Sequence, residues 1–200
     1  MTNRIKKRLF DLAIAVPAIV ALAPLLIVVW IAIKLESPGP ALFKQTRVGQ
    51  SNTMFQIFKF RSMRTEQCDK DGKQSTQRDD DRITRVGRII RATSIDELPQ
   101  LINVLCGDMS IVGPRPHALG SLAGEELFWE VSEQYWVRHA LKPGITGLAQ
   151  IRGFRGATEK RDDLEQRLQS DIEYVNGWRL SRDMAIVIGT AKVLIHPNAF

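Results

Sequence analysis

The sequence predicts an α-rich α/β protein made of an N-terminal membrane helix and a small mixed domain. Three observations predict this class. A long uncharged run opens the chain, short alternating segments bounded by proline and glycine follow it, and segments of helical period occupy the C-terminal half. A chain of 200 residues suits about one domain with a sizeable core. We therefore expect a membrane segment over residues 1–35 and a second domain over residues 36–200.

The N-terminal run extends from Leu12 to Ile33 and holds 22 consecutive residues without a charge. About 20 apolar residues are enough for a helix that crosses a bilayer. A secretory signal peptide is disfavoured, because the run is long and ends without a small-residue cleavage site. A buried helix of a soluble protein is the weaker alternative at this length. The run therefore predicts membrane association.

Basic residues flank this run on both sides. They are Arg4, Lys6, Lys7 and Arg8 before it, and Lys34, Lys44 and Arg47 after it. Basic flanks favour the cytoplasmic side, so both ends of the run are expected there. Pro17 and Pro24 lie inside the run, and each removes a helix hydrogen bond and bends the helix. A re-entrant helix that bends near Pro24 and returns to the same face fits both observations better than a straight span.

The composition points to an anionic partner. Basic residues outnumber acidic ones by 28 to 22, which gives a net charge of +6. Such a balance suits nucleic acid, a phosphate-bearing ligand or a membrane surface, and charge alone does not choose among them. Cys68 and Cys106 form no CxxC pattern, and His117, His139 and His196 lack the spacing of metal ligands. Neither a zinc site nor a disulfide framework is indicated.

Strands, a loop and a helix are expected in order after residue 36. Residues 37–49 predict a strand between two turns, and residues 54–63 predict a second strand or an interfacial stretch. Residues 65–82 form a polar run without apolar period, which predicts a loop. Residues 83–94 predict a helix in which arginines recur every three residues. That basic stripe leads directly into an acidic pair.

Helices are expected in the C-terminal part. The aromatic spacing of residues 125–139 predicts an amphipathic helix. Residues 164–195 predict two helices separated near Gly177. The last of them is apolar but short and carries Asp183 and Lys192, so we expect it to pack or to lie at an interface rather than to span a membrane.

The segment TSIDELPQ, residues 93–100, places Asp96 beside Glu97. Ser94 and Glu97 fit a capping box, in which each side chain binds a backbone N–H at a helix start. Pro99 agrees with a helix start, because proline is tolerated near the first turn. A reaction centre built on the two carboxylates is the other interpretation. These eight residues alone do not decide between them.

Two loops rich in glycine and proline carry arginine. Gly113 and Pro114 restrict the backbone at Arg115, whose planar guanidinium suits pairs of phosphate oxygens. Gly144 and Arg155 lie in a second such segment, residues 141–156. Neither segment has the order of a P-loop or of a dinucleotide fingerprint. A rigid turn that happens to contain arginine remains the alternative.

Five segments resemble a known family. KRLFDLAIA, SPGPALFKQTRVG, FKFRSM, SIDELPQLINVLCGDMSIVGPRP and KPGITGLAQIRG follow in this order. Together they resemble the bacterial sugar transferases, the monotopic phosphoglycosyl transferases, over nearly the whole chain. That family transfers a sugar 1-phosphate from a nucleotide diphosphate sugar to a polyprenyl phosphate. Residues 153–178 are similar to the branch that primes exopolysaccharide with a hexose 1-phosphate, and the chain looks like the catalytic part of that branch.

The resemblance implies roles for the acidic pair. Asp96 would be the nucleophile on the sugar-linked phosphate and a contact of Mg²⁺, and Glu97 would be an assisting carboxylate. An aspartate can form an acyl phosphate, which splits one transfer into two displacements. The first displacement would release UMP. Mg²⁺ and arginines would neutralise charge on the phosphate oxygens.

The resemblance also implies which residues surround the substrate. The substrate-binding residues expected on this basis are Lys59, Arg61, Asp80, Arg82, Arg91, Gly113, Pro114, Arg115, Gly144 and Arg155. Asp80 and Arg82 match a DxR element, in which Asp81 stands where the family often has proline. Pro24 matches the helix-breaking proline, and Ala23 precedes it where many relatives have serine.

The expected partners are a UDP-sugar, polyprenyl (undecaprenyl) phosphate and the lipid of the bacterial inner membrane, with the active site of a cytosolic domain on the cytosolic face. Glucose or galactose is the expected sugar, a homodimer is left open, and nucleic acid is not expected. Two other functions compete with the transferase. One is a non-catalytic membrane scaffold of an envelope assembly. The other is a membrane-tethered binder of anions or nucleic acid, although no helix-turn-helix, zinc or RNA-binding signature is present.

Overall fold

The structure is a computed structural model that describes residues 3–65, 80–154, 158 and 160–195. Its elements in chain order are α1 (Asn3–Glu36), β1 (Leu42–Val48), η1 (Gln50–Asn52), β2 (Met54–Phe60), α2 (Arg85–Ala92), η3 (Ile95–Glu97), α3 (Gln100–Cys106), β3 (Ser110–Val112), β4 (Leu122–Ala123), β5 (Glu126–Leu127), η4 (Glu133–Ala140), β6 (Gly144–Thr146), α4 (Leu148–Ile151), α5 (Arg161–Asn176) and α6 (Leu180–Ile195), where η denotes a 3₁₀ helix. The strands of the described part pair two by two. β1 and β2 are antiparallel, β3 and β6 are parallel, and β4 and β5 are antiparallel.

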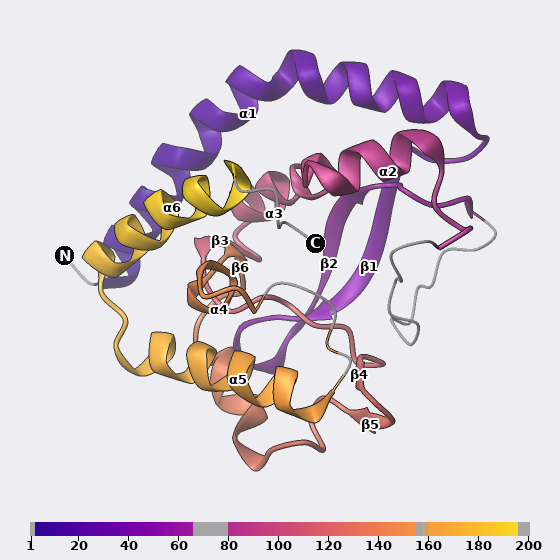
Figure 1. The fold of residues 1–200 in the computed structure, drawn as a ribbon. Helices are drawn as coiled ribbons and strands as arrows, with labels where there is room; N and C mark the ends of the chain where they lie inside the picture. Colours follow the sequence, from indigo (N-terminus) through magenta and orange to yellow (C-terminus); the bar gives the residue numbers. More distant parts are fainter. Residues whose placement is uncertain (1–2, 66–79, 155–157, 159, 196–200) are drawn as a thin grey trace.

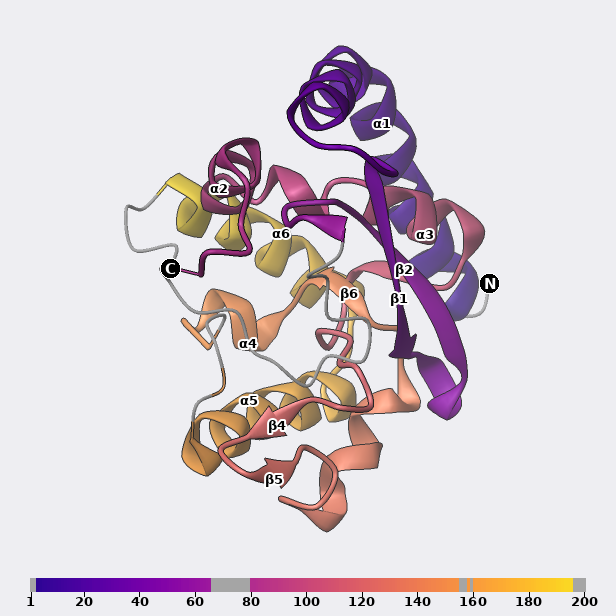
Figure 2. The same cartoon turned by 90° about the vertical axis from the view of Figure 1, so that its right-hand side faces the viewer.

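The helices form layers across the molecule. Figure 1 shows α1 arching over a layer that contains α2, α3 and α6, with the β1–β2 hairpin beside it. α5 and the β4–β5 hairpin lie at the end away from α1 (Figures 1 and 2). The expected helix-rich mixture of helices and strands is confirmed.

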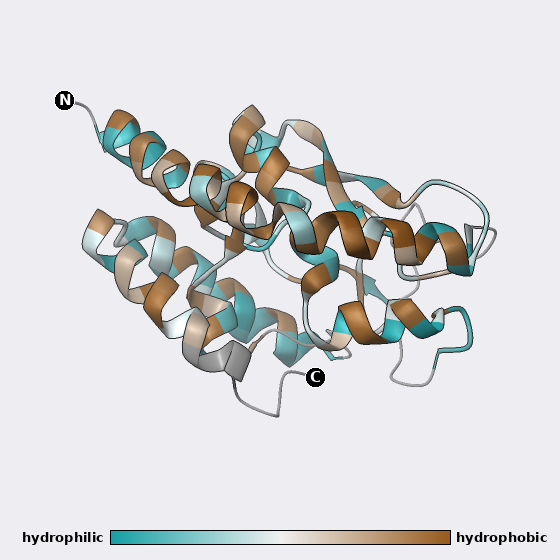
Figure 3. Ribbon diagram, turned by 90° about the horizontal axis from the view of Figure 1, so that it is seen from above, coloured by the Kyte–Doolittle hydropathy of each residue, from teal (hydrophilic) through white to brown (hydrophobic). Residues whose placement is uncertain are grey.

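α1 is one continuous helix that bends. It covers 34 residues and keeps both Pro17 and Pro24 inside it. Figure 1 shows it changing direction along its length, as expected where a proline removes a hydrogen bond and its ring displaces the preceding turn. It is long and apolar enough to cross a membrane, and little of it is buried. Its first turns are largely hydrophilic and most of its second half is hydrophobic (Figure 3).

Both ends of α1 pack on the same body, and one face of its middle also packs there through the fully buried Ala15. Near the N-terminus, Asp11 is buried and accepts hydrogen bonds from the Ser110 hydroxyl at 2.8 Å and the Ile111 backbone N–H at 3.1 Å. Near the C-terminus, Val29 and Ile33 join a buried cluster with residues of β2 and α2. Full burial of such a side chain contributes roughly 1.5–3 kcal/mol. The exposed large apolar side chains between these anchors include Val16, Val20, Leu25, Ile27 and Val28.

The β1–β2 hairpin joins α3 through one buried amide. Asn103 is fully buried on α3, and its side-chain oxygen accepts from the Phe58 backbone N–H at 2.9 Å. Its amide nitrogen donates to the Gln56 backbone oxygen at 2.6 Å. The side chain thus satisfies strand groups that would otherwise lack partners at the edge of β2. This contact sets the position of α3, and of the turn before it, against the hairpin.

Glycines allow β3 and β6 to approach closely. A Cβ on Gly113 would lie 2.2 Å from the Lys142 backbone oxygen, and one on Gly144 would lie 2.1 Å from the Gly113 nitrogen. Real Cβ atoms do not approach backbone so closely, so any larger residue would push the strands apart. The Gly113 N–H donates to the Thr146 oxygen at 2.9 Å, and the Gly144 N–H donates to the Pro114 oxygen at 3.0 Å. These contacts fix the backbone that leads into Arg115.

Most of the predicted elements are confirmed. β1 and β2 fall within residues 37–49 and 54–63, α2 falls within residues 83–94, and α5 and α6 are separated at Gly177. α6 packs through Asp183, which is fully buried. Most of the loop expected over residues 65–82 lies outside the described residues.

The amphipathic helix expected over residues 125–139 was wrong. The chain forms the β4–β5 hairpin through a turn at Gly124, whose φ of 66° lies in the left-handed region. It then forms the 3₁₀ helix η4, where the Ser132 hydroxyl accepts from the Gln134 N–H at 3.2 Å. Turn chemistry and an N-cap therefore outweigh the aromatic spacing in this segment.

Candidate active site

Glu97 is held by two cations from different elements. The Lys59 ammonium on β2 lies 2.8 Å from its Oε1 atom. The Arg115 guanidinium, from the loop after β3, donates to Oε2 at 3.1 Å and makes a second, shorter contact with Oε1. The Glu97 side chain is only 12% exposed. Paired, charge-assisted hydrogen bonds of this kind fix a carboxylate firmly in place.

The acidic pair lies on the 3₁₀ turn η3 between α2 and α3. α2 ends at Ala92, and Ser94, the N-cap of η3, has a φ of 58° in the left-handed region. The capping box expected from Ser94 and Glu97 was wrong, because the Ser94 side chain makes no capping hydrogen bond and Glu97 turns to Lys59 and Arg115. α3 begins only at Gln100, with Pro99 at its N-cap. The left-handed residue redirects the chain before a longer helix can form.

Asp96 has a different environment from its neighbour. It has no hydrogen bond or ion pair to any residue in the described ranges. Burial raises the pKa of its carboxyl above the usual value, Lys59 opposes this rise, and Glu97 adds to it. Arg91 and Arg115 also lower the pKa of Asp96. Asp96 is therefore a carboxylate surrounded by cations but bound by none of them.

The ionisation states around Glu97 follow from burial and pairing. Burial alone would raise the pKa of Glu97, but Arg115 and Lys59 outweigh it and hold that pKa well below the usual range. Burial lowers the pKa of Lys59, and Glu97 offsets this in part. Glu97 in turn raises the pKa of Arg115. Glu97 thus stays ionised at neutral pH with its oxygens engaged, which suits a positioning role better than that of a nucleophile.

A buried network of charged residues binds the backbone of Arg115. The Arg138 guanidinium donates to the Arg115 backbone oxygen at 2.6 Å and pairs with Asp171 at 2.7 Å. It also lies 2.9 Å from His117 Nδ1. Burial is the main cause that holds the pKa of His117 well below its usual value, and the nearby charge of Arg138 lowers it further. The ring is therefore neutral, and its Nδ1 atom accepts the hydrogen bond from Arg138. This network fixes the loop that carries Arg115.

Sequence reasoning did not find this network. Arg138 lies in the aromatic segment 125–139, and Asp171 lies in a helix with many charges. Nothing in the local pattern separates these two from the exposed ion pairs of the same segments. A charged residue at a buried helix position was the one available signal, and it requires knowing which face of α5 packs inward.

The structure brings together some of the other expected residues. Arg91 donates to the Ser62 hydroxyl at 3.4 Å and acts on the pKa of both Asp96 and Asp80. Asp80 and Arg82 pair with each other, with the closest contact at 2.6 Å. The Arg82 hydrogen bond holds the pKa of Asp80 below its usual value. The two charged residues of the DxR element thus pair with each other, close enough to Arg91 for Arg91 to lower the pKa of Asp80.

Arg61 was expected to bind the substrate, but its guanidinium is bound by other residues of the protein. It is 3% exposed, and its guanidinium donates to the Ser37 backbone oxygen at 2.8 Å and the Thr65 hydroxyl at 2.5 Å, and also to the Pro38 backbone oxygen. It therefore joins the end of α1 to the loop after β2 and is not part of the cluster around Glu97. Arg155 lies outside the described residues.

Gly113, Pro114 and Gly144 act through the backbone. The contacts between β3 and β6 described above place these three residues directly before Arg115 or opposite it. A cavity of about 150 Å³ opens beside the turn, lined by η3, β6, α4 and α6 and including Ser94 and Glu97. It leaves room beside Glu97 for a small part of a ligand, and Asp96 is not part of its lining.

The described residues offer too few ligands to hold a magnesium ion by themselves, but they could hold one together with the phosphates of the substrate. They contain no group of three or more His, Cys, Asp or Glu that could hold a metal. Mg²⁺ commonly binds through one or two carboxylates together with substrate phosphates and water. Asp96 offers such a carboxylate, since nothing else in the described ranges binds it, whereas both Glu97 oxygens are engaged.

Comparison with known sequences agrees with this geometry. The sequence model of the family described as bacterial sugar transferase matches residues 2–197. The chain belongs to this family. The match spans α1, the acidic turn and both C-terminal helices, so it covers the long apolar helix and the candidate active site together.

Among the relatives of this sugar transferase, one is named for exopolysaccharide production and two are named for glucose phosphate transfer that involves undecaprenyl phosphate. It is 50% identical over 184 residues to the exopolysaccharide production protein PSS of Rhizobium leguminosarum bv. phaseoli, covering 92% of each chain. It is 52% identical over 199 residues to an undecaprenyl-phosphate glucose phosphotransferase of Komagataeibacter xylinus, covering 99% of this chain and 37% of that protein. It is 50% identical over 193 residues to a UDP-glucose:undecaprenyl-phosphate glucose-1-phosphate transferase of Caulobacter vibrioides, covering 96% of this chain and 70% of that protein.

Proposed function

We propose that this sugar transferase transfers glucose 1-phosphate from UDP-glucose to undecaprenyl phosphate and releases UMP, as the first membrane step of exopolysaccharide synthesis. The observation that carries the proposal is the contrast between two consecutive carboxylates. Glu97 is bound by Lys59 and Arg115, while Asp96 faces the same cations without a bond to a described residue. Such a carboxylate is suited to attack phosphorus. The names of two relatives supply the sugar and the lipid.

The proposed reaction has two displacements. In the first, an Asp96 carboxylate oxygen bonds to the sugar-linked phosphorus, the bond from that phosphorus to the bridging oxygen breaks, and UMP leaves with the electron pair. In the second, an oxygen of the lipid phosphate bonds to the same phosphorus. The acyl phosphate bond then breaks, and the Asp96 carboxylate is restored. A covalent intermediate of this kind lets the soluble donor leave before the lipid acceptor reacts.

The surrounding residues position and neutralise the phosphates. Arg115, Arg91 and Lys59 supply positive charge where negative charge gathers on phosphate oxygens, which is the main requirement of phosphoryl transfer. Glu97 keeps Arg115 and Lys59 in place and so stops them from binding Asp96 directly. A magnesium ion held by Asp96 and the donor phosphates would add further charge neutralisation.

We further propose that α1 is re-entrant and holds the active site at the cytosolic face of the inner membrane. Both ends of α1 pack on the same body, and exposed apolar residues such as Val20, Ile27 and Val28 lie between them. A straight span across a hydrocarbon core of about 30 Å would separate these ends onto opposite faces. A bend at the prolines allows both ends to remain at one face. The site then meets the lipid phosphate at headgroup level.

Nucleotide release tests the reaction. The purified chain in detergent is supplied with Mg²⁺, undecaprenyl phosphate and a panel of UDP-sugars, beside an Asp96→Asn variant. We expect UMP from UDP-glucose and none from the variant. The matched control is Asp162→Asn, which removes an exposed carboxylate from α5 and should leave the rate unchanged. Release of UDP would indicate ordinary glycosyl transfer, and release of neither nucleotide would favour a scaffold.

Cysteine accessibility tests the topology. Single cysteines are placed at Asn3 and Ser37 in a chain whose Cys68 and Cys106 are serine. With a re-entrant helix, a membrane-impermeant thiol reagent should miss both positions in intact spheroplasts and label both after permeabilisation. A spanning helix would expose one of the two positions in intact spheroplasts.

A further inference from the structure

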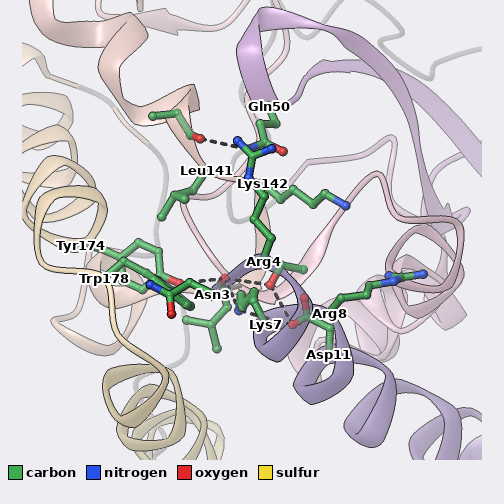
Figure 4. A pocket seen from close by; sticks show the side chains of 13 residues that line it. Asn3, Arg4, Lys7, Arg8, Asp11, Gln50, Leu141, Lys142, Tyr174 and Trp178 are labelled. Carbon is green, nitrogen blue, oxygen red and sulfur yellow. Dashed lines mark hydrogen bonds and ion pairs between the residues drawn. The ribbon is translucent and has the colours of Figure 1, made fainter. Parts of the chain in front are cut away.

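A basic cavity lies at the N-terminal end of α1, outside the candidate active site. It measures about 460 Å³ and is lined by the first turns of α1, the loop before β6 and the end of α5 (Figure 4). Four basic side chains and one acidic side chain line it: Arg4, Lys7, Arg8 and Lys142, with Asp11. This volume falls within the usual range of ligand cavities. Its lining contains neither Asp96 nor Glu97.

One of the four cations is already neutralised. Lys7 pairs with Asp11 at 3.3 Å and with the buried Asp183 at 2.7 Å. It also donates to the Val112 backbone oxygen at 3.1 Å. Lys7 and its two carboxylates therefore form a structural group that ties α1 to β3 and α6. Because Asp11 and Asp183 pair with Lys7, neither carboxylate forms an ion pair with Arg4, Arg8 or Lys142.

The other three cations lack an ion pair with any described carboxylate. The side chains of Arg4 and Lys142 make no hydrogen bond within the described ranges. The Arg8 side chain donates only to the backbone oxygens of Val104 and Leu105 at the end of α3. Figure 4 shows Arg4 reaching from α1 toward Gln50, whereas Arg8 and Lys142 extend together to a different side of the cavity. Positive charges gathered without a carboxylate repel one another, and a bound anion would relieve that repulsion.

Gly107 shows how near two of these cations are to each other. A Cβ on Gly107 would lie 3.6 Å from Lys142 Nζ and 3.9 Å from an Arg8 guanidinium nitrogen. Burial lowers the pKa of Lys142, and Arg8 lowers it further. Asp11 and Asp108 oppose that change without forming a contact with Lys142. The two cations thus border one small volume.

We propose that this cavity binds a phosphate group through Arg4, Arg8 and Lys142. Two sources share this chemistry, the headgroup of an anionic phospholipid and a soluble phosphate. The cavity lies in the polar first turns of α1, directly before the uncharged run that begins at Leu12. It is larger than a free phosphate needs, and Leu141 and Trp178 add apolar lining. These features favour the lipid headgroup, and the proposal does not depend on the transferase reaction.

Calorimetric titration of the full chain in zwitterionic detergent tests the site. The probe is dihexanoyl phosphatidylglycerol, and the variant is Arg4→Gln with Lys142→Gln. We expect the double variant to bind at least about tenfold more weakly, which corresponds to about 1.4 kcal/mol. The control is Lys6→Gln, which removes an exposed charge from the same helical turn outside the cavity and should leave the affinity within about twofold.

Competition separates the two sources. If millimolar inorganic phosphate displaces the lipid probe, the site takes a soluble phosphate as well. If inorganic phosphate fails to displace it, the site requires the lipid headgroup. Equal affinity of the wild type and the double variant would overturn the proposal, and so would an equal loss in Lys6→Gln, since that would mean general attraction to a basic surface. Thermal unfolding of each variant checks that it is folded. The single variants Arg4→Gln and Lys142→Gln should each show part of the loss in affinity for the lipid probe.

Discussion

Replacing Glu97 by glutamine should destabilise the protein through the cations that it leaves behind. The side chain keeps its shape, but Lys59 and Arg115 lose the charge that pairs them, at contacts of 2.8 Å and 3.1 Å. Removing one partner of a buried pair costs about 3–5 kcal/mol. The side chains of Lys59 and Arg115 are 19% and 25% exposed, so solvent reduces that cost. We expect a loss of roughly 2–3 kcal/mol at neutral pH.

Thermal unfolding at several pH values measures this loss. For a chain of this size, roughly 2–3 kcal/mol lowers the Tm by about 4–12 °C. The folded-state pKa of Glu97 lies well below its unfolded value, so its stabilisation is complete above the unfolded pKa and disappears as the pH falls through the folded pKa. The difference in Tm between wild type and variant should therefore be largest at neutral pH and shrink in acid.

An exposed ion pair provides the matched control. Glu165→Gln removes the partner of Arg161 at 2.9 Å on the surface of α5, where solvent screens the pair. This variant should unfold with the wild type. The reasoning fails if Glu97→Gln and Glu165→Gln have the same Tm, or if the deficit of Glu97→Gln grows as the pH is lowered.

Three other substitutions test separate parts of the site. Arg91→Gln removes a cation that lowers the pKa of Asp96, so the acidic limb of the pH–rate profile of UMP release should move to higher pH; an unchanged limb would place Arg91 outside the electrostatics of the nucleophile. Asp171→Asn leaves Arg138 buried without its counter-charge and should cost about 3–5 kcal/mol in denaturant unfolding, a cost that a surface pair would not show. Gly113→Ala brings a Cβ to 2.2 Å from a backbone oxygen and should cost at least about 1–3 kcal/mol, so an unaltered unfolding midpoint would contradict the close strand contact.

Local patterns were sufficient to predict the elements whose boundaries depend on local chemistry. The strand over Leu42–Val48 ends at a glycine, and the last two helices separate at Gly177. Uncharged length alone predicted α1, because an apolar run of this length is enough for a helix that could cross a membrane. The bend in α1 followed from its prolines. In each case the signal lies within a few residues of the feature that it predicts.

Contacts between distant segments were not available from the sequence. Glu97 could be interpreted as a capping residue until the structure placed Lys59, 38 residues earlier in the chain, against it. Arg61 was expected near the phosphates, yet backbone oxygens at the end of α1 take its guanidinium. A motif specifies that a residue type is needed, whereas only the packed fold decides which charges face one another.

The short 3₁₀ turn explains how two consecutive acids come to differ. In a 3₁₀ helix each residue advances by about one third of a turn, so neighbouring side chains diverge by about 120°. Glu97 consequently points between Lys59 and Arg115, while Asp96 points away from direct contact with them. A salt bridge to Asp96 itself would hold the carboxylate and weaken it as a nucleophile. Because Glu97 takes the two cations, they remain close enough to act on a phosphate and leave Asp96 available to react with it.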